Sequence, residues 1–195
     1  MNKTTAIKII RESAIVYDNQ FVNQNLMIVF GNINAPDTVE IKGSSSNFLH
    51  LTGMSINKSF CPSAEMFFKK ALHNKLQERD FDFKDGTAIQ KLQVLKQVLN
   101  VSKNANMIGD YNYNSAHIKL DTHKLAGNIR ACIGFKRNGK YFIPNTVLNT
   151  DMRNETINTQ RILMILSKSI SEINYNNIEY VAKGIDTDSL LKVLK

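Results

Sequence analysis

The sequence predicts an α+β fold in which an antiparallel β-sheet packs with amino-terminal helices. Two observations support this prediction. The amino-terminal half contains three stretches whose apolar residues recur at helical spacing, and the second half contains short apolar runs separated by turn sequences. The chain has 195 residues, of which 43% are hydrophobic, so we expect one domain, residues 1–195, with a substantial core.

Three helices and three strands are predicted in the amino-terminal half. The first helix follows from apolar residues at helical intervals between residues 7 and 17. The second begins at Pro62 and Ser63, residue types that favour helix starts, and the third opens at the Asp-Gly-Thr sequence 85–87. The strands are expected at residues 26–30, 38–42 and 48–52, and the first of them is a continuous apolar run that suits a buried strand.

The second half is predicted to consist mainly of strands. Short runs place these strands at residues 107–109, 116–120, 129–136, 140–147, 162–166 and 177–182. The sequence Arg137-Asn138-Gly139 separates two of them, and Asn-Gly accepts the positive φ angles of a hairpin turn. A short closing helix is expected over residues 186–195, with Asp186 or Thr187 near its amino end.

The chain is strongly basic, with a formal net charge of +8 at pH 7. Excess cationic charge favours partners rich in phosphate, because binding releases their condensed counterions, although a solvated Lys-rich surface gives the same composition. We therefore expect RNA or another nucleic acid as the partner. Charges interrupt the apolar positions of the amino terminus, and no apolar run has the length to span a bilayer, so we expect a cytoplasmic protein without a membrane partner.

Metal and nucleotide motifs are missing from the sequence. Cys61 and Cys132 are far apart and lack neighbouring His or Cys residues at ligand spacing, so two free thiols are expected. Gly-rich phosphate loops, a nucleophile elbow and the paired carboxylates of a two-metal nuclease are also absent. We therefore expect neither a metal nor another cofactor.

The segment 47–53 carries the strongest chemical signal. In a strand over residues 48–52, His50 and Thr52 share one face with Phe48, while the leucines between them enter the core. Imidazole can act as a general acid or base near neutral pH, and a Thr hydroxyl can bind a phosphate or a ribose. A strand-end histidine that bonds to a loop is the alternative, structural interpretation, and the pattern leaves both open.

Basic residues supply the remaining site candidates. Lys168 follows the apolar run 162–166 with serines on both sides, an arrangement that can clamp a phosphate, although a solvated strand end gives the same sequence. A second catalytic histidine could come from His117 or His123, although a surface position is favoured for both. The predicted catalytic residues are His50, Thr52 and Lys168, and the predicted substrate-binding residues are Lys91, Thr146 and Arg153. In such a site a base deprotonates the ribose 2′-hydroxyl, and cations stabilise the charge that develops on the phosphate.

Several short motifs together resemble one known family. They are the segment 48–53, the helix 67–72, the Asp-Gly-Thr sequence 85–87 with residues 91–95, and Gly134-Phe135 followed by Pro144-Asn145-Thr146. Over roughly residues 40–185, the chain resembles the fourth family of phage-associated predicted nucleases in the barnase–EndoU–colicin E5/D–RelE (BECR) superfamily. This resemblance implies a compact α+β domain with a four-stranded antiparallel sheet and an RNA-cleaving site on the face of that sheet.

The functional hypothesis is a metal-independent endoribonuclease of phage or mobile-element origin that cleaves RNA at the 2′-hydroxyl. A protein inhibitor is left open as a second partner. One alternative is an NAD-dependent ADP-ribosyltransferase-like toxin, because the His-x-Thr sequence at 50–52 also resembles those enzymes and Glu179 could supply their later glutamate. The other alternative is a non-catalytic nucleic-acid-binding accessory protein of a phage, which would use its basic face alone.

Overall fold

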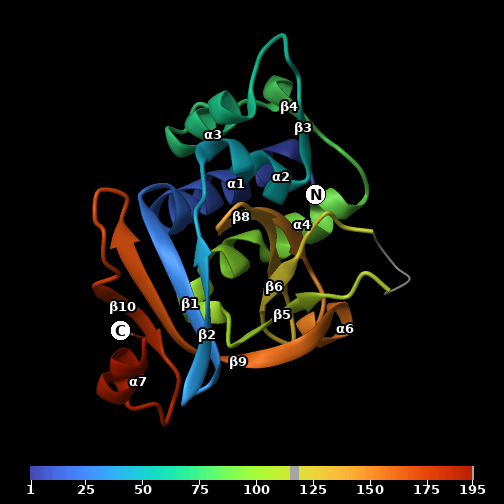
Figure 1. Ribbon diagram of the computed structural model, residues 1–195. Helices are drawn as coiled ribbons and strands as arrows, with labels where there is room; N and C mark the ends of the chain where they lie inside the picture. The colour runs from blue at the N-terminus through green and yellow to red at the C-terminus, as the bar shows by residue number, and fades with distance from the viewer. Residues whose placement is uncertain (115–118, 195) are drawn as a thin grey trace.

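A computed structural model describes residues 1–114 and 119–194 of the chain. Helices α1 to α4 gather at one end of the molecule, and a strongly curved sheet lies beneath them (Figure 1). The helices are α1 (Lys3–Tyr17), α2 (Phe48–Thr52), α3 (Ala64–Leu72), α4 (Thr87–Leu99), α5 (Val101–Asn104), α6 (Met152–Glu155) and α7 (Thr187–Val193). A π-helical turn, Asp18–Val22, continues α1, and 3₁₀ turns occur at Ser45–Asn47 and Glu78–Asp80.

The four helices predicted from local sequence signals, α1, α3, α4 and α7, are present. Side chains that precede three of them satisfy backbone N–H groups of the first turn, which otherwise have no partner. The Asn2 side chain accepts from Thr5 N–H at 2.9 Å, and the Ser63 hydroxyl accepts from Met66 N–H at 3.1 Å. Asp186 caps α7 in the same way. The predicted helix starts at 63 and 186 are therefore confirmed.

Eight strands form the main sheet, in which β1 and β9 also pair with each other. The strands are β1 (Gln24–Asn32), β2 (Ala35–Ile41), β5 (Met107–Tyr111), β6 (Lys124–Gly127), β7 (Cys132–Asn138), β8 (Tyr141–Leu148), β9 (Thr156–Ser169) and β10 (Asn177–Val181). Their order is β1-β2-β8-β7-β6-β5-β9-β10. Because β9 pairs with both β5 and β1, seven of the strands close into a ring, and β10 extends the sheet from β9.

The α+β class is confirmed, but the prediction of an antiparallel sheet needs correction, because the sheet is mixed. Strands β2 and β8 run parallel and meet at Ile41 and Phe142, whereas the other neighbours in the sheet are antiparallel. The physical reason is the odd number of strands in the ring. Directions cannot alternate all the way around seven strands, so one parallel pair is unavoidable once the sheet closes.

Individual strand predictions had mixed outcomes. The predicted hairpin is present as β7 and β8, with Gly139 at φ +59° in its turn. The strand predicted at 48–52 is wrong, because those residues form α2. Of the strand predicted at 116–120, residues 116–118 lie outside the described residues, and residues 119 and 120 are not in a strand. A two-stranded sheet of β3 (Met54–Ile56) and β4 (Phe81–Phe83) was not predicted.

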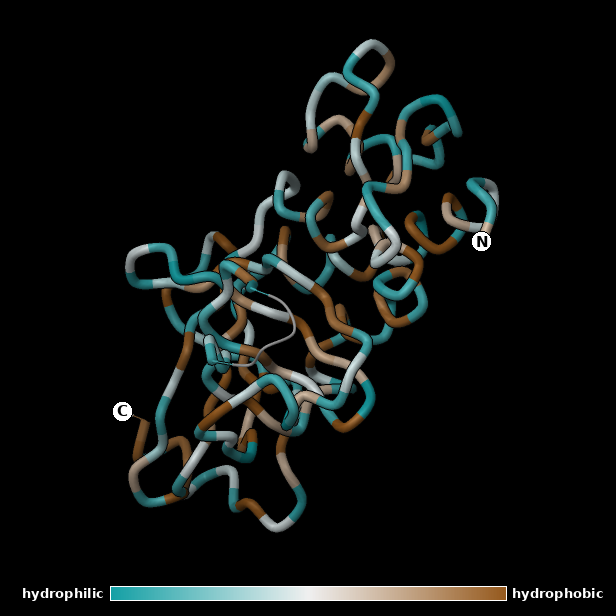
Figure 2. The backbone as a smooth tube through the Cα atoms, turned by 90° about the vertical axis from the view of Figure 1, so that its right-hand side faces the viewer, coloured by the Kyte–Doolittle hydropathy of each residue, from teal (hydrophilic) through white to brown (hydrophobic). Residues whose placement is uncertain are grey.

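The main hydrophobic core lies between the helices and the sheet. Four aromatic side chains, Tyr17, Phe48, Phe67 and Phe68, pack at its helical end with ring centroids between 5.2 and 6.4 Å apart. Apolar residues mark much of the interior course of the chain, while many projecting loops are hydrophilic (Figure 2). A smaller cluster, which includes Leu190, fixes α7 against β9. Among the described residues, no helix has the length and apolarity needed to cross a membrane.

Candidate active site

His50 lies on α2 and not on a strand. Asn47 and Ser44 form a reciprocal pair of capping hydrogen bonds just before this helix, and Gly53, in the left-handed region at φ +72°, ends it. The helix buries Phe48 and Leu51, three residues apart, and leaves His50 exposed. The strand prediction failed because a segment of five residues can match the two-residue period of a strand and the 3.6-residue period of a helix. Here the buried side chains have helical spacing, and the segment forms a helix.

Thr52 does not share the exposed face of His50. Its side chain is fully buried, its hydroxyl donates to the Leu49 carbonyl at 2.7 Å, and the same oxygen accepts from Met54 N–H at 3.2 Å. These bonds join the end of α2 to the start of β3. Thr52 therefore holds the backbone that carries His50, and its hydroxyl is not available to a ligand in this arrangement.

A pocket of about 450 Å³ brings three of the predicted site residues together. His50 from α2, Lys91 from α4 and Thr146 from β8 line this space, which we call the His50 pocket. Lys84, Asp85 and Thr87, from the start of α4 and the residues before it, line it as well. The sequence indicated residues 85–87 as a helix start and as one motif of the family resemblance, but not as site residues, because a capping function and a binding function use the same residue types.

Lys91 places its ammonium group beside His50 in this pocket. Its ammonium group lies 3.4 Å from the His50 carbonyl oxygen. Burial lowers the pKa of Lys91, an effect that the nearby Asp85 carboxylate partly opposes. Asp85 itself is held by Thr87, because the Thr87 backbone N–H and hydroxyl both donate to its carboxylate, and these bonds lower the Asp85 pKa. A phosphate entering the pocket would therefore meet a partly desolvated ammonium group.

The structure does not bring Lys168 and Arg153 into the His50 pocket. Lys168 lies on β9, donates to the Ile173 carbonyl at 2.7 Å and sits 4.4 Å from the centre of the Tyr175 ring. Arg153 belongs to α6, where its guanidinium makes an ion pair with Asp151 at 2.6 Å. Neither side chain is among the residues that line the pocket. The sequence around Lys168 favoured a phosphate ligand, but the turn after β9 provides its partner, and Arg153 is paired with the Asp151 that precedes α6.

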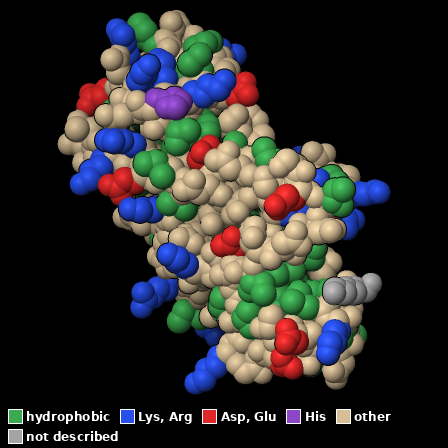
Figure 3. Space-filling model, turned by 90° about the vertical axis from the view of Figure 1, so that its left-hand side faces the viewer, with side chains coloured by type: hydrophobic (Ala, Val, Ile, Leu, Met, Phe, Trp, Pro, Cys, Tyr) green, Lys and Arg blue, Asp and Glu red, His purple; other side chains and the backbone are tan. Residues whose placement is uncertain are grey.

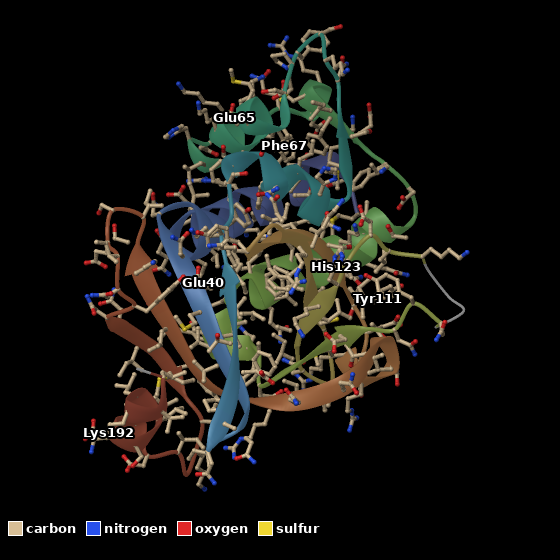
Figure 4. The ribbon with its side chains drawn as sticks, viewed as in Figure 1. Glu40, Glu65, Phe67, Tyr111, His123 and Lys192 are labelled. Atoms are coloured by element: carbon tan, nitrogen blue, oxygen red, sulfur yellow. The ribbon has the colours of Figure 1, made fainter. Side chains whose placement is uncertain are left out.

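A second and larger hollow, about 880 Å³, opens between β2 and the strands β5 to β9. An adjoining hollow of about 480 Å³ shares Asp110, Lys124 and Arg137 with it and adds His123 and Tyr113. We call the two together the sheet cleft. Figure 4 shows Glu40 on β2 at one side of the molecule's centre and His123 and Tyr111 at the other. The charged side chains that line the cleft are Asp37, Glu40, Asp110, Lys124, Arg137 and Lys140.

His123 is held in one orientation at the rim of the sheet cleft. Its Nδ1 accepts from the backbone N–H of Arg137 at 3.3 Å, and its own backbone N–H donates to the Phe135 carbonyl at 2.9 Å. A neutral imidazole whose Nδ1 accepts a hydrogen bond carries its proton on Nε2. The sequence offered His123 as a possible second catalytic histidine but favoured a surface position, and it could not show the bond that fixes the ring, because that bond comes from β7.

The basic side chains are not confined to these hollows. Figure 3 shows Lys and Arg side chains distributed over the helical end of one face of the molecule, and a hydrophobic group near its other end. Within the part of the chain that the structure describes, no group of three or more His, Cys, Asp or Glu residues is placed to hold a metal ion. Cys61 and Cys132 are both buried free thiols, and burial raises the pKa of each.

Comparison with known protein families agrees with this α+β architecture. The family described as phage-Barnase-EndoU-ColicinE5/D-RelE like nuclease4 matches residues 9–184, which is most of the chain. The chain therefore belongs to this family of BECR-like nucleases. Comparisons with curated proteins and with solved structures gave no match. Membership in a nuclease family implies a nucleic acid substrate.

Proposed function

We propose that this nuclease is an endoribonuclease that cleaves RNA at the ribose 2′-hydroxyl without a metal ion. The observation that carries the proposal is the meeting of His50 and Lys91 in one open pocket. The histidine supplies an imidazole that can accept and return a proton, and the lysine supplies a cation for a phosphate. The formal net charge of +8 favours the approach of a polyanion.

In the proposed reaction, His50 acts as the general base. It removes the proton of the 2′-hydroxyl, the 2′-oxygen attacks the adjacent phosphorus, and the bond from phosphorus to the 5′-oxygen breaks. The protonated His50 can then return its proton to the departing 5′-oxygen, which leaves a 2′,3′-cyclic phosphate. Lys91 stabilises the additional negative charge on the phosphate oxygens, with Lys84 at the pocket wall as a second cation.

The other predicted site residues have different places in this proposal. Thr146 lines the pocket and is proposed to bind the ribose or the phosphate through its hydroxyl. Thr52 acts as a positioning residue, because its two hydrogen bonds fix the end of the helix that bears His50. The role of phosphate ligand, predicted for Lys168 and Arg153, is assigned here to Lys91 and Lys84, which line the same pocket as His50.

Cleavage of a labelled mixed-sequence RNA in excess EDTA tests the proposal. We expect cleavage by the wild-type protein and a loss of about 100-fold or more in His50→Ala, since general acid–base catalysis typically contributes 10²–10⁴-fold. The matched control is His73→Ala, because His73 is an exposed histidine at the end of α3 that does not line the pocket. Equal activity of the two variants would remove His50 from the reaction.

The same preparation distinguishes the two alternative functions. Transfer of label from NAD to a protein or nucleic acid, without RNA cleavage, would identify an ADP-ribosyltransferase. Salt-sensitive RNA binding without turnover, unaffected by His50→Ala, would identify a non-catalytic binding protein. Cleavage that requires added Mg²⁺ and stops in EDTA would overturn the metal-independent mechanism while leaving nuclease activity in place.

A further inference from the structure

We propose that the sheet cleft is a second nucleotide subsite, which binds the RNA strand a few residues away from the bond that is cut in the His50 pocket. The inference rests on the proposed ribonuclease function. It assigns a phosphate of that strand to His123 and Arg137, which line the cleft together. The sheet cleft would thus bind substrate without contacting the reacting atoms.

The His50 pocket and the sheet cleft share one rim, the segment 120–124. Leu120 lines the His50 pocket, and His123 and Lys124 line the sheet cleft. An extended chain advances at most about 3.3–3.6 Å per residue, so the four steps from Leu120 to Lys124 span no more than about 14 Å. A single strand of a few nucleotides covers that distance, and one RNA molecule can therefore occupy both hollows.

Hydrogen bonds from neighbouring strands hold this rim in place. The Asn145 side-chain amide donates to the Asp121 carbonyl at 2.8 Å, and the Tyr113 hydroxyl donates to the Thr122 carbonyl at 2.6 Å. Lys136 makes an ion pair with the Asp121 carboxylate. A rim fixed at several points keeps the two hollows in a constant relative position, which lowers the conformational cost of binding one strand across both.

The cations that line the sheet cleft differ in whether a carboxylate pairs with them. Lys124 makes an ion pair with Asp110 at 2.6 Å, so these two charges largely cancel. Arg137 makes no ion pair with a carboxylate among the described residues, and its guanidinium lies 5.5 Å from the centre of the Phe142 ring. Beside it lies the His123 imidazole, whose Nδ1 accepts from the Arg137 backbone N–H. This part of the cleft therefore offers an unpaired guanidinium, with an imidazole next to it, to a phosphate.

Tyr141 and Phe142 also line the cleft, but neither offers an open ring face for a nucleobase. The Lys42 ammonium group lies 3.2 Å from the centre of the Tyr141 ring, and Phe142 is buried beside Arg137. We therefore assign no base-stacking surface to the cleft, and the proposed ligand there is a phosphate of the RNA strand.

Two substrates of different length test this subsite. A dinucleotide reaches only the His50 pocket, whereas an eight-nucleotide RNA can fill the sheet cleft as well. We expect Arg137→Gln and His123→Ala to lower kcat/KM for the eight-nucleotide RNA by about tenfold and to leave dinucleotide cleavage unchanged. Arg130→Gln is the matched control, because Arg130 is exposed and lines neither hollow.

Binding of a non-cleavable 2′-deoxy eight-nucleotide strand separates this inference from the proposed function. Weaker binding by Arg137→Gln, with recovery in Arg137→Lys, would support the subsite even if the wild-type protein cleaves no RNA. Wild-type affinity in both Arg137→Gln and His123→Ala would overturn it. An equal loss of dinucleotide and eight-nucleotide cleavage in His123→Ala would also overturn it, because the reaction would then take place in the sheet cleft.

Discussion

Gly53 ends the helix that carries His50, and it lies where this helix packs against the helix that carries Lys91. Its φ of +72° lies in the left-handed region, and a Cβ added there would come within 2.8 Å of the Ala88 Cα and 3.2 Å of the Lys91 Cδ. The conformational cost for a residue other than glycine is about 1–2 kcal/mol. Crowding against a helix backbone adds about 1–3 kcal/mol, because that backbone cannot rotate away. We therefore expect Gly53→Ala to lower the free energy of unfolding by about 2–5 kcal/mol.

Gly139→Ala provides the matched control. Gly139 has a similar φ of +59°, but a Cβ there would meet no atom within 4 Å. The decrease in the free energy of unfolding should stay at about 1 kcal/mol in Gly139→Ala, since only the conformational cost of the positive φ applies. Alanine also restricts the unfolded chain, which offsets part of that cost. Urea unfolding followed by circular dichroism measures both variants. Equal losses in the two variants would refute the close approach of α2 and α4, and with it the packing that builds the His50 pocket.

Two further predictions concern charged groups. Because burial lowers the Lys91 pKa, wild-type affinity for a 2′-deoxy oligonucleotide should fall at a lower pH than that at which an ordinary lysine loses its proton, while Lys91→Arg should keep its affinity there. Fluorescence anisotropy measures both, and parallel curves would contradict the prediction. Lys70→Met should destabilise the fold by about 3–5 kcal/mol in urea unfolding, because it leaves the fully buried Asp80 carboxylate without its ion pair at 2.7 Å. The double variant with Asp80→Asn should recover part of this loss, and no recovery would show that the ion pair is not the cause.

Features that depend on neighbouring residues were predictable from the sequence. The helix starts at Ser63 and Asp186 and the turn at Gly139 require specific residue types at fixed positions, and all three are found where expected. The α+β class follows from the same signals, since helices and strands have different hydrophobic periods. His50 illustrates the limit of this approach, because alternation over five residues could not distinguish a strand from a short helix.

Features that depend on distant residues were not predictable. The parallel contact of Ile41 with Phe142 exists only because the ring closes, and no local pattern encodes that closure. Lys168 has the sequence context of a phosphate ligand, but the turn after β9 provides the carbonyl that it contacts. The sheet cleft takes its side chains from several strands, so their proximity depends on the order of the strands in the sheet.

The pairing of β1 with β9 has a consequence for how the chain folds. Gln24 lies opposite Ser169, so β1, which is synthesised early, can complete its pairing only after β9 has been synthesised. Closing so long a loop costs entropy before any contact compensates for it, and topologies rich in such contacts fold slowly. During synthesis, the apolar run 26–30 can pair with β2 on one side only, which leaves a hydrophobic strand edge exposed until β9 emerges.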